Sequence, residues 1–233
     1  MYNKKSKPIA IIPARSGSER IPYKNIKLFH GKPIIGYSIE AAKKSNIFSK
    51  VIVSTDDDSI GSIAQSFGAE YLFKRPNNIS NNSSTIKEVI KHTINWLEKN
   101  ILSAEIICCI YATAPMIDVK DLLKSYNIIK KKKCDYVLSA CRNSHPIQRS
   151  FFLDKKKKIH LVNKKTFLKR SQDLTETFCD AAHFCWGRKE AWEKKTPFNG
   201  NSRLFLVPYL RVKDIDTKED WKNAERLFYL MKK

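Results

Sequence analysis

Apolar runs of five to eight residues alternate with helix-length segments along the first 140 residues. This alternation constrains the fold more than any other feature. The strand-like runs cover residues 8–14, 50–55, 69–73, 105–112 and 135–140. Strands that are apolar throughout are typical of parallel sheets, because helices bury both faces of such a sheet. The sequence therefore predicts an α/β fold with a mostly parallel sheet covered by helices on both faces.

The intervening segments have helical signatures. Helices are predicted over residues 33–44, 56–68, 83–100 and 217–231, with another beginning near Asp118. The segment 83–100 carries apolar residues at helical spacing, namely Ile86, Val89, Ile90, Ile94 and Leu97. Further strands are predicted at residues 181–188 and 204–210.

The rhythm breaks between residues 142 and 180, where short apolar patches mix with many charges and no helix period is present. We expect this segment to be an arm, with a small β-ribbon, that projects from the rest of the chain. The simplest organisation is one domain over residues 1–233 with an inserted arm at about 142–180.

The net charge of +21 raises the alternative of a non-catalytic protein that binds nucleic acid. Ten of the 44 cations are Arg and the other 34 are Lys, many of them in plain runs. Because Arg is the residue favoured for bidentate phosphate and base recognition, the composition favours a lysine-rich, solvated surface. A nucleic-acid-binding protein would instead show affinity that falls steeply with salt.

No apolar stretch in the sequence is long enough to cross a bilayer, and the first seven residues do not resemble a signal peptide. The six cysteines lack C-x-x-C spacing, and Cys108 and Cys109 sit together in an apolar run. This pattern favours free thiols over disulfides or a zinc site. We expect a cytoplasmic protein without membrane or nucleic-acid partners.

The loop after the first strand is unusually rich in cations and small residues. It offers Arg15, Ser16, Gly17, Ser18, Arg20 and Lys24. Cations and accessible backbone N–H groups are what a polyphosphate needs, and ligands of parallel sheets bind beyond the carboxyl ends of strands. The loop lacks the P-loop and dinucleotide fingerprints. A solvated basic turn is the alternative interpretation.

Asp214 and Asp216 alternate along an extended stretch, so both carboxylates project to one side of it. Mg²⁺ is the natural cation between two such carboxylates, since it prefers one or two protein carboxylates plus phosphate oxygens and water. The alternative is that both residues shape a turn before a helix that begins at Thr217.

Two other segments carry polar groups. Thr113 closes the most hydrophobic strand, where a ligand of the sheet would lie. Arg170 and Gln172 lie in the arm and would suit a sugar acid, because a guanidinium pairs with a carboxylate and an amide with hydroxyls.

Together, several motifs resemble the cytidylyltransferases that activate nonulosonic acids, the CMP-sialic acid synthetase (acylneuraminate cytidylyltransferase) group. These motifs are "IIPARSGSERIPYKNI" (11–26), "GKPIIGYSIEAA" (31–42), "VIVSTDD" (51–57), "RP" (75–76), "CCIYATAP" (108–115) and "DIDT" (214–217). Four motifs are similar to the pseudaminic acid branch of that group: "CCIYATAP" (108–115), "PIQR" (146–149), "RSQDL" (170–174) and "FCWGRKEAW" (184–192). The resemblance covers residues 7–230.

The resemblance implies a Mg²⁺-dependent reaction of CTP with pseudaminic acid that gives CMP-pseudaminic acid and pyrophosphate. Sialic, legionaminic and 3-deoxy-manno-octulosonic acids are alternative sugar acids. It also implies a Rossmann-like α/β sheet, and a homodimer in which the arm reaches the neighbouring subunit's active site.

The resemblance assigns roles to single residues. Arg15 and Lys24 would hold the triphosphate, and Asp214 and Asp216 the metal. The nucleotide would contact Ser16, Gly17, Arg20, Asn25, Arg75, Thr85 and Thr113. Gln148, Arg170 and Gln172 would bind the sugar.

Two residues depart from the family pattern. Glu19 stands where family members usually carry Lys, and a carboxylate facing a triphosphate would be repulsive. We expect Arg20 to compensate; the alternatives are that Glu19 turns away or that activity is impaired. Ala182 occupies a usual Gly position, where its methyl group would narrow the sugar pocket.

Overall fold

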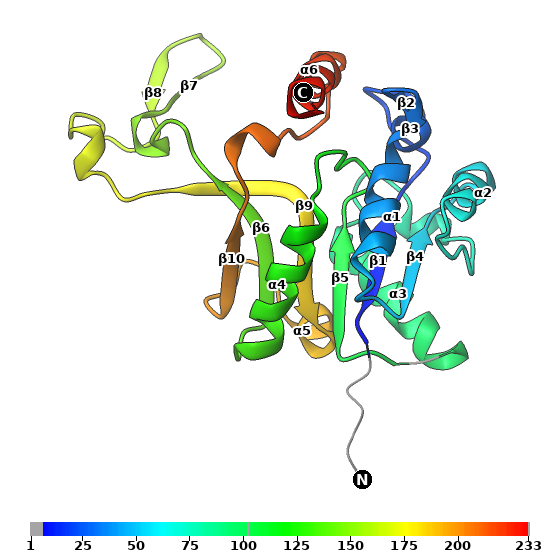
Figure 1. Cartoon of the computed structure of the whole chain (residues 1–233). Coiled ribbons are helices and arrows are strands. Elements are labelled where there is room, and N and C mark those ends of the chain that lie inside the picture. The colour runs from blue at the N-terminus through cyan, green and yellow to red at the C-terminus, as the bar shows by residue number, and fades with distance from the viewer. Residues whose placement is uncertain (1–6, 102, 233) are drawn as a thin grey trace.

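The computed structural model describes residues 7–101 and 103–232. Its centre is a six-stranded sheet in the order β10-β6-β9-β5-β1-β4 (Figure 1). The strands are β1 (Ile9–Pro13), β4 (Lys50–Ser54), β5 (Ile106–Ile110), β6 (Tyr136–Arg142), β9 (Phe178–Arg188) and β10 (Ser202–Leu206). β1 pairs in parallel with β4 and β5, and β10 with β6. The predicted α/β class with a mostly parallel sheet is confirmed.

Helices cover both faces of the sheet, as the apolar strands predicted. One face packs against α1 (Ile34–Ser45), α2 (Asp58–Ser66) and α4 (Val119–Lys131), and the other against α3 (Ile86–Asn100) and α5 (Lys189–Lys194). Alternate residues of β1 point to opposite faces, so Ile12 joins the first core and Ile11 the second.

The last helix, α6 (Lys218–Lys232), completes a third apolar cluster beyond one end of the sheet. There Trp221 and Phe228 pack on Phe29 of the short hairpin formed by β2 (Leu28–Phe29) and β3 (Lys32–Pro33). This packing draws the segment before α6, which contains Asp214 and Asp216, to the end of the sheet where β1 and β5 finish (Figure 1).

The prediction of a strand over residues 69–73 is wrong. This edge segment meets β4 only at two isolated bridges among the described residues, Ile52 with Glu70 and Thr55 with Lys74. Between the two bridges, the ring of Tyr71 packs closely over Gly61 of α2.

Strand β9 runs antiparallel to both of its neighbours, β5 and β6. Its pairing with β6 shifts between Leu138 and Ala140. The hydroxyl of Ser139 accepts hydrogen bonds from the backbone N–H groups of His183 and Phe184 at this shift. The irregularity therefore leaves these two buried donors satisfied and redirects the segment beside it.

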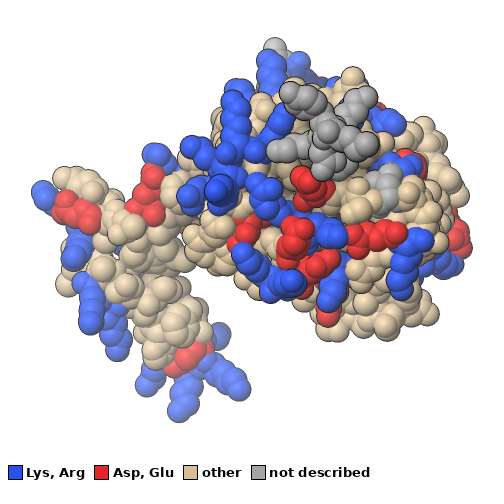
Figure 2. Space-filling model, turned by 90° about the horizontal axis from the view of Figure 1, so that it is seen from below, with Lys and Arg blue, Asp and Glu red and all other residues tan. Residues whose placement is uncertain are grey.

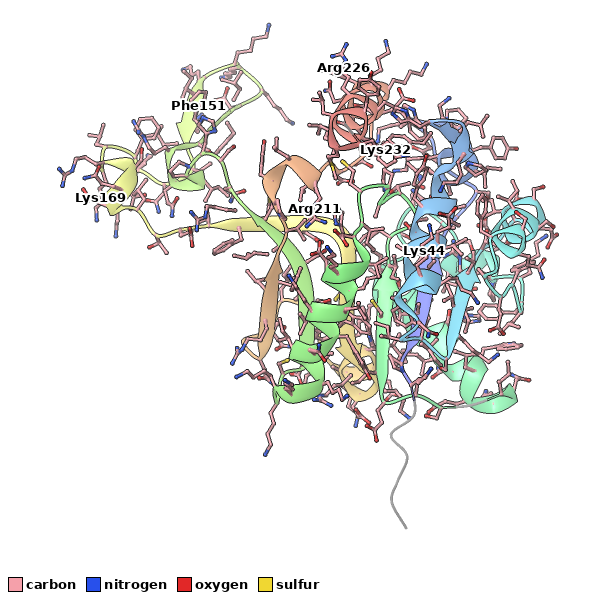
Figure 3. All side chains as sticks on the ribbon, viewed as in Figure 1. Lys44, Phe151, Lys169, Arg211, Arg226 and Lys232 are labelled. Atoms are coloured by element: carbon pink, nitrogen blue, oxygen red, sulfur yellow. The ribbon has the colours of Figure 1, made fainter. Side chains whose placement is uncertain are left out.

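The residues between β6 and β9 project from the sheet as an arm (Figure 1). The arm contains a ribbon of β7 (Phe151–Leu153) and β8 (Ile159–Leu161), as the sequence predicted. Its described apolar side chains are largely exposed, including Phe151, Phe152, Ile159 and Leu168. Figure 3 shows Phe151 and Lys169 far from the body of the chain.

Over the described residues, none of the helices combines the length and apolar character needed to span a membrane.

Candidate active site

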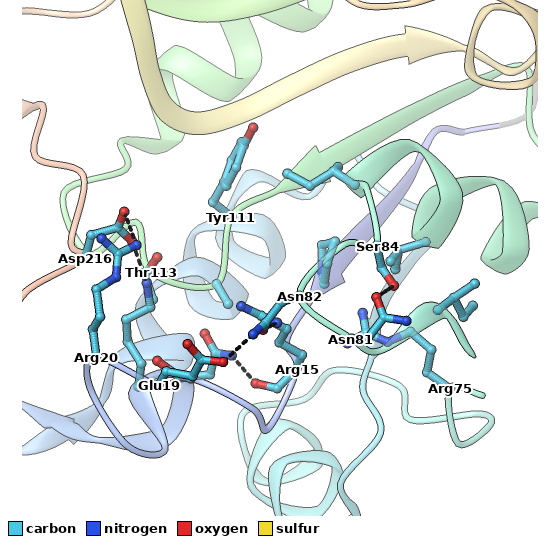
Figure 4. Close-up of a pocket in the computed structure, with 18 of the residues that line it drawn as sticks. Arg15, Glu19, Arg20, Arg75, Asn81, Asn82, Ser84, Tyr111, Thr113 and Asp216 are labelled. Carbon is cyan, nitrogen blue, oxygen red and sulfur yellow. Dashed lines mark hydrogen bonds and ion pairs between the residues drawn. The ribbon is translucent and has the colours of Figure 1, made fainter. Parts of the chain in front are cut away.

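A pocket of about 550 Å³ opens beyond the carboxyl ends of β1 and β5. Four segments that are distant in sequence form its walls: the loop after β1, the residues from Arg75 to the start of α3, the end of β5 with the residues after it, and the stretch before α6 (Figure 4). The lining includes Arg15, Ser18, Glu19, Arg20, Lys24, Asn25, Arg75, Asn81, Asn82, Ser84, Tyr111, Thr113, Asp214 and Asp216. The pocket therefore gathers cations, carboxylates and small polar groups at the place where ligands of such sheets bind.

Buried hydrogen bonds hold the loop after β1 in place. Asn25 is 8% exposed, and its side-chain amide donates to the backbone carbonyl of Arg15 at 2.8 Å. The backbone N–H and the hydroxyl of Ser16 donate to Asp56, which follows β4, at 3.0 and 2.6 Å. These contacts fix the start of the loop against the sheet and leave the Arg15 side chain facing the pocket.

Asp56 also anchors Arg75, whose guanidinium is 3.5 Å from the carboxylate and only 3% exposed. Partial burial would raise the pKa of Asp56, but hydrogen bonds from Ser16 and the charge of Arg75 outweigh it and lower that pKa. Asp56 therefore stays ionised and holds the Arg75 charge at the wall of the pocket.

The carboxylate of Asp216 faces two cations of the loop after β1. It lies 2.7 Å from Arg20 and 3.3 Å from Lys24, and Lys24 also donates to the carbonyl of Ile215 at 2.7 Å. Figure 4 shows Arg20 turned toward Asp216. The interactions bring the predicted phosphate and metal segments together, although the paired residues are 191 to 196 positions apart in the chain.

Asp214 lines the same pocket, and its pKa is raised by burial and by the charge of Asp216. A buried carboxylate next to a second carboxylate is a suitable donor set for a divalent cation. No cluster of three or more His, Cys, Asp or Glu side chains suited to a metal occurs within the described chain. The pair fits a Mg²⁺ ion that takes its remaining ligands from phosphate and water.

Asp180 and Tyr111 lie beside this pair. The hydroxyl of Tyr111 donates to Asp180 at 3.5 Å, and burial together with the Asp214 charge raises the pKa of Asp180. Ala182 adopts a left-handed conformation with φ of 50°, and its N–H donates to Asp180 at 2.8 Å. The usual Gly would adopt this conformation without strain. The residue at position 182 therefore influences the backbone conformation that orients Asp180. The narrowing of the sugar pocket by the Ala182 methyl group remains a prediction.

The structure brings most of the predicted site residues together. Those that line the pocket are Arg15, Arg20, Lys24, Asn25, Arg75, Thr113, Asp214 and Asp216. Ser16 and Gly17 line a shallower hollow next to it. Thr85 caps α3, where its hydroxyl accepts from the N–H of Glu88 at 3.2 Å.

The predicted sugar residues are on the arm, away from these walls. Gln148 donates to the carbonyl of Thr175 at 2.8 Å, and Arg170 pairs with Asp173 at 2.9 Å. Gln172 is exposed in a single 3₁₀ turn.

Sequence reasoning missed several lining residues, among them Asn81, Asn82, Ser84 and Tyr111. The run "NNSS" before α3 was a signal, because a cluster of small polar residues between periodic segments marks a loop. Its position opposite the loop after β1 depends on tertiary packing, which no local pattern reveals.

Comparison with known proteins is consistent with this geometry. A model of the cytidylyltransferase family matches residues 9–228. The chain is 39% identical to a pseudaminic acid cytidylyltransferase of Campylobacter jejuni serotype O:2, over 95% of this chain and 96% of that protein. It is 30% identical to an N-acylneuraminate cytidylyltransferase of Escherichia coli O18:K1:H7, over 94% of this chain and 52% of that protein.

Solved structures share the fold at lower identity. A CMP:2-keto-3-deoxy-manno-octonic acid synthetase in complex with CTP has a TM-score of 0.71 and 17% identity, covering 97% of this chain and 100% of its own. A 4-diphosphocytidyl-2C-methyl-D-erythritol synthase of Anaerococcus prevotii has a TM-score of 0.64 and 15% identity, covering 97% and 99%. From the family match and the identity along nearly its whole length, this chain belongs to the cytidylyltransferases, a family of nucleotidyltransferase enzymes.

Proposed function

We propose that this chain transfers CMP from CTP to pseudaminic acid, a nine-carbon keto-sugar acid, giving CMP-pseudaminic acid and pyrophosphate. The main support for pseudaminic acid as the sugar is the 39% identity to the Campylobacter jejuni enzyme over nearly the whole of both chains. The mixed-charge pocket at the end of β1 and β5 supports a nucleotide triphosphate as the other substrate.

In this proposal the loop after β1 binds the phosphates. Arg15 and Lys24 contact the triphosphate, Arg20 and the Ser16–Gly17 backbone assist them, and the remaining predicted residues contact the nucleotide. The latter are Asn25, Arg75, Thr85 and Thr113. Arg75 is suited to this because its guanidinium is already fixed by Asp56 and needs little ordering when the ligand binds.

Asp214 and Asp216 would hold Mg²⁺, which when bound would neutralise charge on the phosphates and the departing pyrophosphate. Arg20 lies 2.7 Å from Asp216, so its guanidinium is beside the carboxylates that would hold the ion. In this proposal Arg20 compensates for Glu19.

The reaction needs no covalent enzyme intermediate. The anomeric hydroxyl oxygen of the sugar attacks the α-phosphorus, the bond from that phosphorus to the bridging oxygen of pyrophosphate breaks, and the hydroxyl proton passes to solvent. Arg15 and Lys24 favour this by holding the phosphates in line with the attacking oxygen and by offsetting negative charge.

We further propose a cytoplasmic homodimer in which the arm of one subunit supplies sugar contacts to its partner. The support is geometric: Gln148, Arg170 and Gln172 lie on the arm, outside the lining of their own chain's pocket, and the arm exposes apolar side chains. Figure 2 shows Lys and Arg side chains distributed along this arm, where they would attract an acidic sugar.

The test is an assay of pyrophosphate release from CTP with a panel of pseudaminic, sialic, legionaminic and 3-deoxy-manno-octulosonic acids. We expect turnover with pseudaminic acid and its loss in Asp216→Ala with the thermal midpoint retained. A clear preference for another acid would contradict the substrate assignment. Full activity of Asp216→Ala would contradict the assignment of the metal site.

A further inference from the structure

Asn82, which precedes α3, connects two residues of the loop after β1. Its side-chain carbonyl accepts a hydrogen bond from the Arg15 guanidinium, and its side-chain N–H donates to the carboxylate of Glu19. Figure 4 shows the Asn82 amide between these two side chains. All three residues line both the main pocket and the shallower hollow beside it.

The partners of the four cations that line the pocket differ in charge. Arg20 and Lys24 are paired with Asp216, and Arg75 is paired with Asp56. Arg15 is instead held by a neutral amide, so its positive charge is not offset by the group that positions it. A triphosphate would meet this guanidinium without first displacing a carboxylate.

Glu19 could neutralise Arg15 directly. The two residues are four positions apart in one loop, both border the same pocket, and Glu19 is exposed and able to rotate. Both groups already reach the same Asn82 amide, and a carboxylate and a guanidinium within reach of each other form a charge-assisted hydrogen bond. The Asn82 amide occupies both groups at once.

We propose that Asn82 is a positioning residue that holds Glu19 away from Arg15, so that the Arg15 charge remains available to the triphosphate. Asn is suited to this position because its side chain offers an acceptor to the cation and a donor to the anion. The inference rests on the proposed function in that it requires the triphosphate to bind in this pocket. It also explains how the loop accommodates a carboxylate at position 19.

The experiment measures CTP binding by isothermal titration calorimetry in the presence of MgCl₂ for the full chain. Asn82→Ala should weaken CTP binding about tenfold, because an ion pair with Glu19 must then be broken for Arg15 to bind phosphate. Binding of CMP should weaken less, since CMP lacks two of the three phosphates that Arg15 is assigned to hold.

A second substitution separates positioning from structure. Glu19→Gln removes the competing charge, so Asn82→Ala combined with Glu19→Gln should bind CTP within about twofold of Glu19→Gln alone. Asn78→Ala is the control, because Asn78 is exposed in the same segment and lies outside the pocket lining as described; it should bind like wild type.

The outcomes distinguish this inference from the proposed function. If wild type binds CTP and Asn82→Ala binds it equally well, the inference is wrong and the function stands. If the double variant is as weak as Asn82→Ala, loss of loop structure explains the defect and the inference is again wrong. If wild type binds no CTP, both fail.

Discussion

At the scale of single residues, the charged groups of the pocket are already arranged by their neighbours. Ser16 and Arg75 keep Asp56 ionised, Asp216 holds Arg20 and Lys24, and Asn82 joins Arg15 to Glu19. Side chains fixed in this way lose little conformational entropy when a ligand binds. Substrate binding then consists largely of exchanging existing partners for phosphate oxygens.

A buried histidine makes the stability of the chain depend on pH. His183 is 3% exposed, and burial lowers its pKa from the usual 6.5 to about 4, although its ring also hydrogen-bonds to the carbonyl of Arg211. Between these values the unfolded chain binds more protons than the folded chain, so stability falls as pH falls from 6.5 to 4. The full effect of one such group is about 3 kcal/mol.

Urea denaturation of wild type and His183→Gln between pH 7 and pH 5 measures this contribution. We expect wild type to lose stability more steeply than the variant over that interval. Equal slopes would show that His183 is not the group responsible.

A second residue-scale prediction concerns Gly187 in β9. A methyl group there would approach Tyr136 to 2.7 Å and would also overlap the Trp192 ring. Gly187→Ala should therefore reduce the free energy of unfolding by about 1–3 kcal/mol. Gly200→Ala is the matched control, because a methyl group at Gly200 meets no described atom within 4 Å. Denaturant titration should separate the two variants; equal stabilities would contradict the close packing.

At the scale of elements, the sequence predicted those helices and strands whose patterns are local. It did not predict features that depend on contacts between residues distant in the chain. The apolar strands and the helix with Ile86, Val89 and Ile90 were predictable because burial imposes their patterns locally. The run 69–73 looked like a strand from composition alone, yet among the described residues this edge segment meets β4 only at two isolated bridges, and Tyr71 packs on Gly61 of α2. The antiparallel direction of β9 depends on the path of the arm, which no local pattern contains.

The same division applies to the candidate site. Residue types indicated Arg15, Lys24, Asp214 and Asp216, but a solvated basic turn and a turn before a helix remained alternatives. Only the fold, which places Asp216 against Arg20 and Lys24, brings the two segments into one pocket. Asn82 could not be recognised from the sequence, since its significance arises only from the packing that brings it against Arg15 and Glu19.

An element-scale prediction concerns the start of α3. Thr85 and Glu88 form a capping box, in which each side chain bonds to the other's backbone N–H. Thr85→Ala should lower the free energy of unfolding by about 1 kcal/mol, and Thr85→Ser should restore most of it. Chemical denaturation measures the change. If Thr85→Ala has the same free energy of unfolding as wild type, the cap contributes little to stability. Nucleotide contact would then be left as the main role of Thr85.

At the scale of the whole molecule, the arm separates two sets of predicted residues. The nucleotide and metal residues line the pocket in the body of the chain, whereas Arg170 and Gln172 are carried outward. A homodimer that exchanges arms would reunite them, because in a two-fold assembly each arm meets the equivalent surface of its partner.

Complementation tests this arrangement. Arg170→Ala impairs the arm and Asp216→Ala impairs the pocket, so each homodimer should have little activity. Co-expression of the two variants should restore about a quarter of the wild-type sites, since random pairing gives half heterodimers with one intact site each. Activity no greater than the sum of the separate variants would show that the arm does not serve a partner's site.

The central claim is that the pocket beyond β1 and β5 binds the triphosphate of CTP. The most direct measurement is a crystal structure of the chain with CTP and Mg²⁺. The account predicts phosphate oxygens in contact with Arg15 and Lys24, and a metal ion on Asp214 and Asp216. Cytidine nucleotide bound elsewhere on the molecule, with residues 14–25 free of it, would contradict the account.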